Sequence, residues 1–348
     1  GHTAIRYEDP ANGIDAVFNY GLFSFNTPNF IFRFSLGETD YQLGATDYAH
    51  FAAEYAFDGR SVWQQTLNLS KEEKAELIRL LQENYRPENR VYRYNFFYDN
   101  CATRPRDKIE ESIIGKVIYP SEPQDGSRSF RDIVHQYCKG HPWARFGIDL
   151  CIGSEADRPI TQRQMMFAPF YLMDAFAGAQ IANDSIQRPL VSDKALIVDA
   201  VSDEEEGGWM PTPLQCSLLL FILTAAATIY SLRKRTGLWG VDLVLFGTAG
   251  IVGCVLAFLA LFSEHPAVSS NFLLLVFHPG QFLFLPYIIY CVRKGKKCWY
   301  LTLNLIVLTL FIAFFPLIPQ RFDFAVVPLA LCLLIRSASN LILTSKKK

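Results

Sequence analysis

The sequence lacks three features that would indicate common functions: a surplus of basic residues, an internal repeat and a metal-binding cluster. Its 33 Lys and Arg residues are balanced by 34 Asp and Glu residues, for a formal net charge of −1. Nucleic-acid-binding proteins usually carry a basic surplus, so we expect no nucleic-acid partner. Cys and His residues do not recur at metal-ligand spacing, so we predict neither a metal nor another cofactor. No leader peptide is visible before a strand-like start, so we expect the natural protein to begin earlier.

Acidic residues are scarce in the C-terminal part of the chain. After Leu214 only Asp242, Glu264 and Asp323 occur, although 12 of the Lys and Arg residues lie there. The part before this point is therefore clearly anionic. An acidic, Gly-containing run at residues 202–208 cannot bury enough apolar surface to fold, and it reads as a linker. We predict an N-terminal domain over residues 1–201, a linker over 202–213 and a second domain over 214–348.

The second domain contains long apolar runs. A bilayer core of ~30 Å needs about twenty mostly apolar residues per helix. Five stretches meet this condition and predict a transmembrane helical bundle: residues 214–232, 238–262, 271–292, 298–317 and 324–343. Pro279 and Pro286 are expected to break or kink the third stretch. Arg336, in the fifth stretch, is expected to snorkel toward the cytoplasmic side.

Basic residues mark every second loop of this domain. They cluster at residues 233–235, 293–297 and 346–348, whereas the alternate loops carry almost none. Short cytoplasmic loops carry an excess of Lys and Arg. We therefore predict a multi-pass protein of the bacterial inner (cytoplasmic) membrane, with a periplasmic N-terminal domain and a cytoplasmic C-terminus. His265 then lies in an outer loop, at the membrane interface.

The N-terminal domain shows an α+β pattern. Residues 2–7 and 14–20 read as a hairpin around a turn at residues 9–13, and strands are predicted around residues 30–34, 55–67 and 90–98. Ser70 and Glu73 form a capping box that starts a helix ending near Glu83. A further helix is predicted from Cys101 to Ile114.

Three cysteines lie on the outer side: Cys101, Cys138 and Cys151. An odd number indicates one pair and one free thiol. Cys138 and Cys151 are thirteen residues apart around a turn-forming Gly-His-Pro, so we predict a disulfide between them. Cys101 is then the free thiol. Most free cysteines are simply buried. A cysteine at a helix start, however, has its thiolate stabilised by the positive end of the helix. For Cys101 we expect Arg104 and Arg106 to add to this stabilisation.

A cysteine nucleophile needs a base, normally histidine. The candidates on the outer side are His2, His50, His135 and His141. If the hairpin turn centres on residues 11–12, His2 faces Gly21 and Asn19 is its diagonal neighbour. Asn19 or Asp15 could then orient the imidazole ring.

Several motifs together resemble a known family. They are Gly-His-Thr-Ala-Ile-Arg at 1–6, Phe-Asn-Tyr-Gly at 18–21, Pro-Glu-Asn-Arg at 87–90, Phe-Tyr-Asp-Asn-Cys-Ala-Thr-Arg at 97–104, Gly-Ile-Asp-Leu at 147–150 and Arg-Pro-Ile-Thr at 158–161. The chain is similar over most of its length to the Bacteroides-type lipoprotein N-acyltransferases. A wider resemblance is to circularly permuted papain-like enzymes, including lecithin–retinol acyltransferase-like proteins, in which His precedes Cys. The resemblance implies a papain-like periplasmic domain followed by transmembrane helices.

The resemblance also implies roles for individual residues. The expected catalytic residues are Cys101 as nucleophile, His2 as base, Asn19 as orienting residue and Asn100 beside the nucleophile. The expected substrate contacts are Tyr20, Arg104 and His265. The implied reaction transfers a fatty acyl chain from a phospholipid to the α-amine of a diacylated lipoprotein through a Cys thioester. A membrane-anchored cysteine peptidase or amidase acting on cell-wall peptides, or a non-enzymatic envelope scaffold, are the alternatives.

Overall fold

The computed structural model describes the chain except residues 24–27, 121–127, 184–186, 201–209 and 346–348. It forms two compact units, each made of two segments. The first unit contains Gly1–Ile133 and Pro159–Gly207, and the second contains Val134–Arg158 and Gly208–Lys348. Residues 134–158, expected in the first domain, therefore belong to the second unit.

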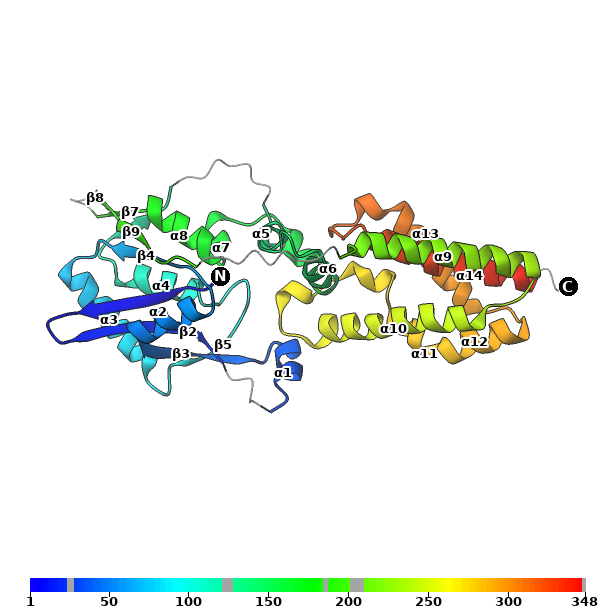
Figure 1. The fold of residues 1–348 in the computed structure, drawn as a ribbon, viewed down its shortest axis with the longest axis horizontal. Helices are drawn as coiled ribbons and strands as arrows, with labels where there is room; N and C mark the ends of the chain where they lie inside the picture. Colours follow the sequence, from blue (N-terminus) through cyan, green and yellow to red (C-terminus); the bar gives the residue numbers. More distant parts are fainter. Residues whose placement is uncertain (24–27, 121–127, 184–186, 201–209, 346–348) are drawn as a thin grey trace. The chain divides into compact units, whose positions relative to one another are not determined.

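The first unit is α+β, as predicted (Figure 1). Its strands form a four-stranded sheet in the order β1-β2-β3-β5, a pair β4-β9 and a three-stranded sheet β6-β7-β8, all with antiparallel neighbours. The strands are β1 (Ala4–Asp9), β2 (Ile14–Leu22), β3 (Asp40–Asp47), β4 (Val62–Leu67), β5 (Val91–Arg93), β6 (Lys116–Ile118), β7 (Gln180–Ala182), β8 (Gln187–Pro189) and β9 (Val191–Val198). The helices of this unit are α1 (Phe30–Leu36), α2 (Tyr48–Phe57), α3 (Lys71–Tyr85), α4 (Thr103–Ser112), α5 (Phe130–Tyr137, which runs into the second unit), α7 (Gln162–Met165) and α8 (Pro169–Gly178).

One hydrophobic core joins the four-stranded sheet to α3 and α4. Leu77 and Leu81 of α3 and Ile109 of α4 pack in it with Phe18 and Leu43 of the sheet. The predicted capping box is present at the start of α3, since the Ser70 side chain accepts from the Glu73 N–H and the Glu73 side chain accepts from the Ser70 N–H. The core thus fixes α4, which follows Cys101, against the hairpin that follows His2.

One strand prediction was wrong, and another was right only in its second half. The segment 30–34 is helix α1, which ends at Gly37 with φ 78°, a conformation that glycine adopts without strain. The segment 55–67 divides into the end of α2 and strand β4. The Asp47 side chain caps α2 by accepting from the N–H groups of Ala49 and His50. Aromatic residues alone therefore did not separate helix from strand in these two segments, because capping and turn residues set the local structure.

The second unit is a helical bundle. Its helices are α6 (Pro142–Cys151), α9 (Pro213–Lys234), α10 (Trp239–Phe262), α11 (Pro279–Leu283), α12 (Leu285–Lys294), α13 (Trp299–Ala313) and α14 (Val326–Ser345), with 3₁₀ turns η1 (Ser154–Asp157), η2 (Pro266–Val268), η3 (Phe272–Leu275) and η4 (Phe315–Leu317). Among the described residues, α9, α10 and α14 are long and apolar enough to cross a membrane. The number rises to four if α12 and α13, which meet at 111°, count as one span. The described residues therefore contain three to four helices that could cross a membrane, whereas the sequence predicted five spans.

The third predicted span is divided into η3, α11 and α12, as its prolines led us to expect. Helix α10 lies alongside this broken segment (Figure 1). A Cβ atom added to Gly250 would lie 2.4 Å from the Phe282 backbone nitrogen, and one added to Gly253 would lie 2.5 Å from the His278 backbone. Glycines at these positions let the two backbones approach closely, as is common between membrane helices.

A buried ion pair joins α10 and α14. The Arg336 guanidinium donates to both carboxylate oxygens of Asp242 at 2.7 and 3.0 Å, and both side chains are 0% exposed. Asn340 donates to the same carboxylate, and Arg336 also donates to Thr228 of α9. The expectation that Arg336 snorkels was wrong, because an acidic partner inside the bundle stabilises the buried charge.

The segment 134–158 is tied to the bundle by main-chain contacts. Asn271 donates to the Leu150 carbonyl at 2.7 Å, and Gln320 donates to the Ile152 carbonyl at 3.2 Å. The Gly153 N–H donates to the Ala267 carbonyl at 2.7 Å. Phe146 and Leu150 pack against the bundle core. These contacts explain why the segment belongs to the second unit.

Candidate active site

The hairpin β1–β2 determines where His2 lies. Ala4 pairs with Asn19 and Asp9 with Ile14, so continuing the register by two residues places His2 opposite Gly21. This is the predicted register. The tight turn at Gly13, with φ 66°, fixes it. His2 and Asn19 therefore meet on one face of the sheet, and His2 Nε2 lies 2.7 Å from Asn19 Oδ1.

A backbone hydrogen bond identifies the protonated nitrogen of His2. The Gly21 N–H, which can only donate, lies 2.8 Å from the same Asn19 atom that contacts His2. That atom must therefore be the carbonyl oxygen of the amide. An acceptor at Asn19 requires a hydrogen on His2 Nε2, so neutral His2 has an unprotonated Nδ1. Asn19 thus holds the ring in the tautomer of a base that works through Nδ1.

Gly21 provides the space in which the His2 ring lies. A Cβ atom at this position would be 2.5 Å from His2 Cε1 and 3.2 Å from His2 Nδ1. Any side chain here would displace the imidazole. Burial lowers the pKa of His2 below its ordinary value, and the Asn19 hydrogen bond opposes this effect. His2 is therefore neutral at pH 7, the form that can accept a proton.

A short loop presents Cys101 at the start of α4. The main chains of Asn95 and Asp99 form an antiparallel bridge with hydrogen bonds of 2.9 and 3.0 Å. Asn100 then stabilises the turn that leads into α4, since its Oδ1 accepts from the N–H groups of Ala102 and Thr103. Its amide nitrogen donates to the carbonyls of Phe96 and Phe167. Every polar atom of the Asn100 side chain is used in holding the loop.

The surroundings of Cys101 favour the neutral thiol. Burial raises the pKa of Cys101, and the nearby backbone N–H of Thr3 lowers it by a smaller amount. Because Thr3 follows His2, this contact brings the sulfur beside the chain segment that carries His2. A buried thiol with a raised pKa needs a base to become a nucleophile.

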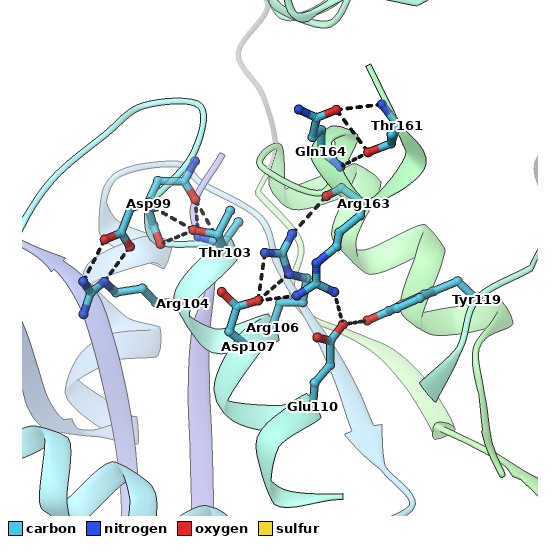
Figure 2. Close-up of polar contacts among 12 residues, drawn as sticks. Asp99, Thr103, Arg104, Arg106, Asp107, Glu110, Tyr119, Thr161, Arg163 and Gln164 are labelled. Atoms are coloured by element: carbon cyan, nitrogen blue, oxygen red, sulfur yellow. Dashed lines mark hydrogen bonds and ion pairs between the residues drawn. The ribbon is translucent and has the colours of Figure 1, made fainter. Parts of the chain in front are cut away.

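The expected stabilisation of the thiolate by two arginines is not found. Figure 2 shows that Arg104 donates to both oxygens of Asp99, at 2.6 and 2.8 Å. Arg106 donates to Asp107 and to the Arg163 carbonyl. Both guanidinium groups are therefore engaged in ion pairs around α4.

Two tyrosines, Tyr41 and Tyr94, lie near enough to Cys101 to be affected by its charge, and the sequence did not reveal them. Burial, and to a smaller extent the charge of Cys101, raise the pKa values of Tyr41 and Tyr94. Both hydroxyls therefore stay protonated near the sulfur. The rings of Tyr41 and Tyr94 stack at 4.1 Å. The alternating run from residue 91 to residue 96 contained the signal, because Tyr94 directly precedes the bridge that leads to Cys101.

Family models match both parts of the chain. The Lnb N-terminal periplasmic domain matches residues 1–125, and the Lnb transmembrane domain matches residues 204–348. The chain belongs to the Lnb family. No curated protein and no solved structure matches it. Lnb membership makes it a membrane protein with a periplasmic N-terminal domain, and it indicates an enzyme of lipoprotein maturation.

Three residues expected at the Lnb site have other roles in this structure. Tyr20 is 0% exposed, and its hydroxyl donates to Asn84 at 2.9 Å, so it is a core residue rather than a substrate contact. Asn100 has no side-chain donor left for a reacting oxygen, so it positions the loop. Arg104 pairs with Asp99 and stacks on Tyr92 at 3.7 Å.

The other candidates for base and orienting residue are elsewhere. Asp15 accepts two hydrogen bonds from Arg6, which leaves Asn19 as the partner of His2. The His50 side chain is 90% exposed. His135 contacts Asp149 in the second unit. His265 also lies in the second unit, half-buried, and its substrate contact stays a prediction.

The predicted disulfide between Cys138 and Cys151 is absent, since both residues are free thiols. Cys151 is the last residue of α6, whereas Cys138 lies in the turn before its first residue. The ten-residue helix between them is about 15 Å long. A disulfide usually joins Cα atoms less than about 7 Å apart. Sequence spacing alone did not reveal this helix.

Proposed function

We propose that this Lnb-family protein is a lipoprotein N-acyltransferase that uses Cys101 as nucleophile and His2 as base. The observation that carries the proposal is the tautomer of His2. Asn19 fixes the proton on Nε2 and leaves Nδ1 free to accept one. The backbone N–H of the next residue, Thr3, lies near the Cys101 thiol, which burial keeps neutral. A histidine that is ready to accept a proton and a thiol that must lose one suit acyl transfer through a thioester.

In the first step, Nδ1 of His2 takes the thiol proton, and the Cys101 sulfur attacks an ester carbonyl of a phospholipid. The carbonyl carbon forms a bond to sulfur, and its bond to the glycerol oxygen breaks. His2 returns the proton to that oxygen, and lysophospholipid leaves. The backbone N–H of Cys101 is the candidate donor to the oxyanion.

In the second step, the α-amine of a diacylglyceryl-cysteine lipoprotein attacks the thioester. A C–N bond forms and the C–S bond breaks, so the product carries an amide-linked third acyl chain. The proton lost by the amine returns to sulfur through His2. A thioester is activated toward amines, and exclusion of water protects it from hydrolysis.

The helical bundle supports a lipid substrate. Both the phospholipid and the lipoprotein reside in a membrane, and an enzyme anchored there meets them by local diffusion. The basic clusters at residues 233–235, 293–297 and 346–348 place the C-terminus in the cytoplasm in this proposal. A C-terminal reporter that is active only in the cytoplasm tests this orientation.

The reaction is tested with a reporter lipoprotein in cells that lack this protein. Intact mass spectrometry of the N-terminal peptide is compared after complementation with wild type, Cys101→Ser, His2→Ala and Cys138→Ser. We expect the third acyl chain with wild type and with Cys138→Ser, which removes a thiol outside the site. Equal acylation by expressed Cys101→Ser protein would contradict the nucleophile assignment. Unchanged lipoprotein mass with wild type would favour cell-wall peptides as substrates.

A further inference from the structure

Helix α1 presents apolar side chains to the surroundings. None of its residues is buried, and Ile31, Phe32 and Phe34 are 80%, 56% and 46% exposed. Exposed apolar clusters usually mark a binding surface, since each exposed methylene costs about 0.8 kcal/mol relative to burial. This helix connects β2, which carries Asn19, to β3, which carries Tyr41. It is therefore joined to the active site by both of its flanking strands.

A row of aromatic rings leads inward from α1. Phe34 lies 6.1 Å from Phe30 and Phe30 lies 5.5 Å from Phe23, as measured between ring centroids. Phe23 then lies 4.8 Å from Tyr41, which stacks on Tyr94 at 4.1 Å. Phe34 at the outer end and Phe23 at the middle are 46% and 38% exposed, whereas Tyr41 is 9% exposed. The row thus passes from an exposed apolar surface into the core.

The inner end of the row lies beside the nucleophile. Tyr94 directly precedes Asn95, whose main chain forms a bridge with Asp99, two residues before Cys101. The charge of Cys101 acts on both Tyr41 and Tyr94. The ring faces are apolar along the whole row, while the two tyrosine hydroxyls at its inner end are polar. A fatty acyl ester has the same sequence of properties, because its apolar hydrocarbon tail is followed by a polar ester group.

We propose that the aromatic row from Phe34 to Tyr94 is the binding track for one fatty acyl chain, with its carbonyl end at Cys101. The proposal rests on the acyl-transfer function above and extends it to the residues that hold the chain. The hydrocarbon core of a bilayer, made of two opposed acyl chains, is ~30 Å thick, so one chain contributes ~15 Å. The four distances between neighbouring ring centroids, from Phe34 to Tyr94, together cover a length comparable to that of one acyl chain. The track therefore binds long acyl chains better than short ones.

The experiment measures acylation of Cys101 in the full chain, reconstituted in lipid nanodiscs. Intact mass spectrometry gives the rate of acyl-enzyme formation from a phospholipid with long chains and from one with short chains. The variants are Phe23→Ser and Phe34→Ser, at the middle and the outer end of the row. Phe57→Ser is the matched control, because Phe57 is 92% exposed in the same unit and lies outside the row.

We expect the ratio of the long-chain rate to the short-chain rate to fall about tenfold in Phe23→Ser, because contacts worth one or two methylenes are lost. Phe34→Ser should lower it by a smaller factor, and Phe57→Ser should leave it unchanged. If the row serves only as part of the core, or if a variant has a folding defect, the two rates should fall together and their ratio should stay the same. An unchanged ratio in both row variants therefore overturns the track. Absence of any acyl-enzyme in the wild type would instead refute the proposed function itself.

Discussion

Replacing Gly21 with alanine tests whether His2 is the base, as proposed, without changing His2 or Cys101 themselves. The added Cβ atom would lie 2.5 Å from His2 Cε1, whereas ordinary contacts are 3.4–4 Å. The imidazole must therefore move by about 1 Å, and a displacement of that size can lower the rate of an enzyme by about 100-fold. We expect Gly21→Ala to slow acyl-enzyme formation on Cys101 by about this factor. The unfolding temperature should change little, since the ring can move aside.

The assay is intact mass spectrometry of the full chain mixed with phospholipid, with thermal unfolding as the check on folding. Gly147→Ala in α6 is the matched control, because a Cβ atom at Gly147 meets nothing within 4 Å. Its rate should equal that of wild type. A folded Gly21→Ala protein with the wild-type rate would refute the argument that His2, seated over this glycine, is the base.

Three further predictions concern other parts of the molecule. Burial lowers the pKa of His2 below 6.5, so the acylation rate should fall only at pH values below 6.5. Because the Asn19 hydrogen bond raises this pKa, Asn19→Ala should move the fall in rate to still lower pH. A midpoint of the pH profile above 6.5 would contradict the assignment of His2 as base. Asp242→Leu leaves the buried Arg336 charge without its partner and should destabilise the second unit by about 3–5 kcal/mol. The double variant Asp242→Leu, Arg336→Leu should recover part of this loss. Thermal unfolding in detergent measures both effects. Asn100→Asp keeps the hydrogen bonds that the side chain accepts but removes the two that it donates, and it should lower stability by about 2 kcal/mol and slow acylation. An unchanged unfolding midpoint would show that the loop is held by other contacts.

The sequence predicted the parts of the site that depend on local rules. The hairpin register followed from a turn with Gly13 in it, because pairing in an antiparallel hairpin is set by turn length. That register correctly placed His2 beside Asn19. The capping box at Ser70 likewise needed only residues three positions apart. Such features are readable because the interacting groups are close in the chain.

The sequence failed where a distant partner decides the outcome. The pKa of Cys101 is raised because the fold buries it, and the arginines expected to lower it pair with Asp99 and Asp107. Arg336 remains inside the bundle because Asp242, 94 residues earlier, faces it. Of the tyrosines near Cys101, Tyr41 lies on β3 and Tyr94 directly follows β5, and these two strands meet only in the sheet. None of these partners could be identified from spacing along the chain.

The membership of residues 134–158 in the second unit has a consequence for dissecting the molecule. The polypeptide crosses between the units three times, near residues 133, 158 and 207. A fragment cut before α9 would keep this segment but lose the groups that bind its main chain, including Asn271 and Gln320. Its apolar side chains Phe146 and Leu150 would then be left bare in water. A water-soluble catalytic fragment would need this segment excised and its two ends rejoined, rather than a single truncation.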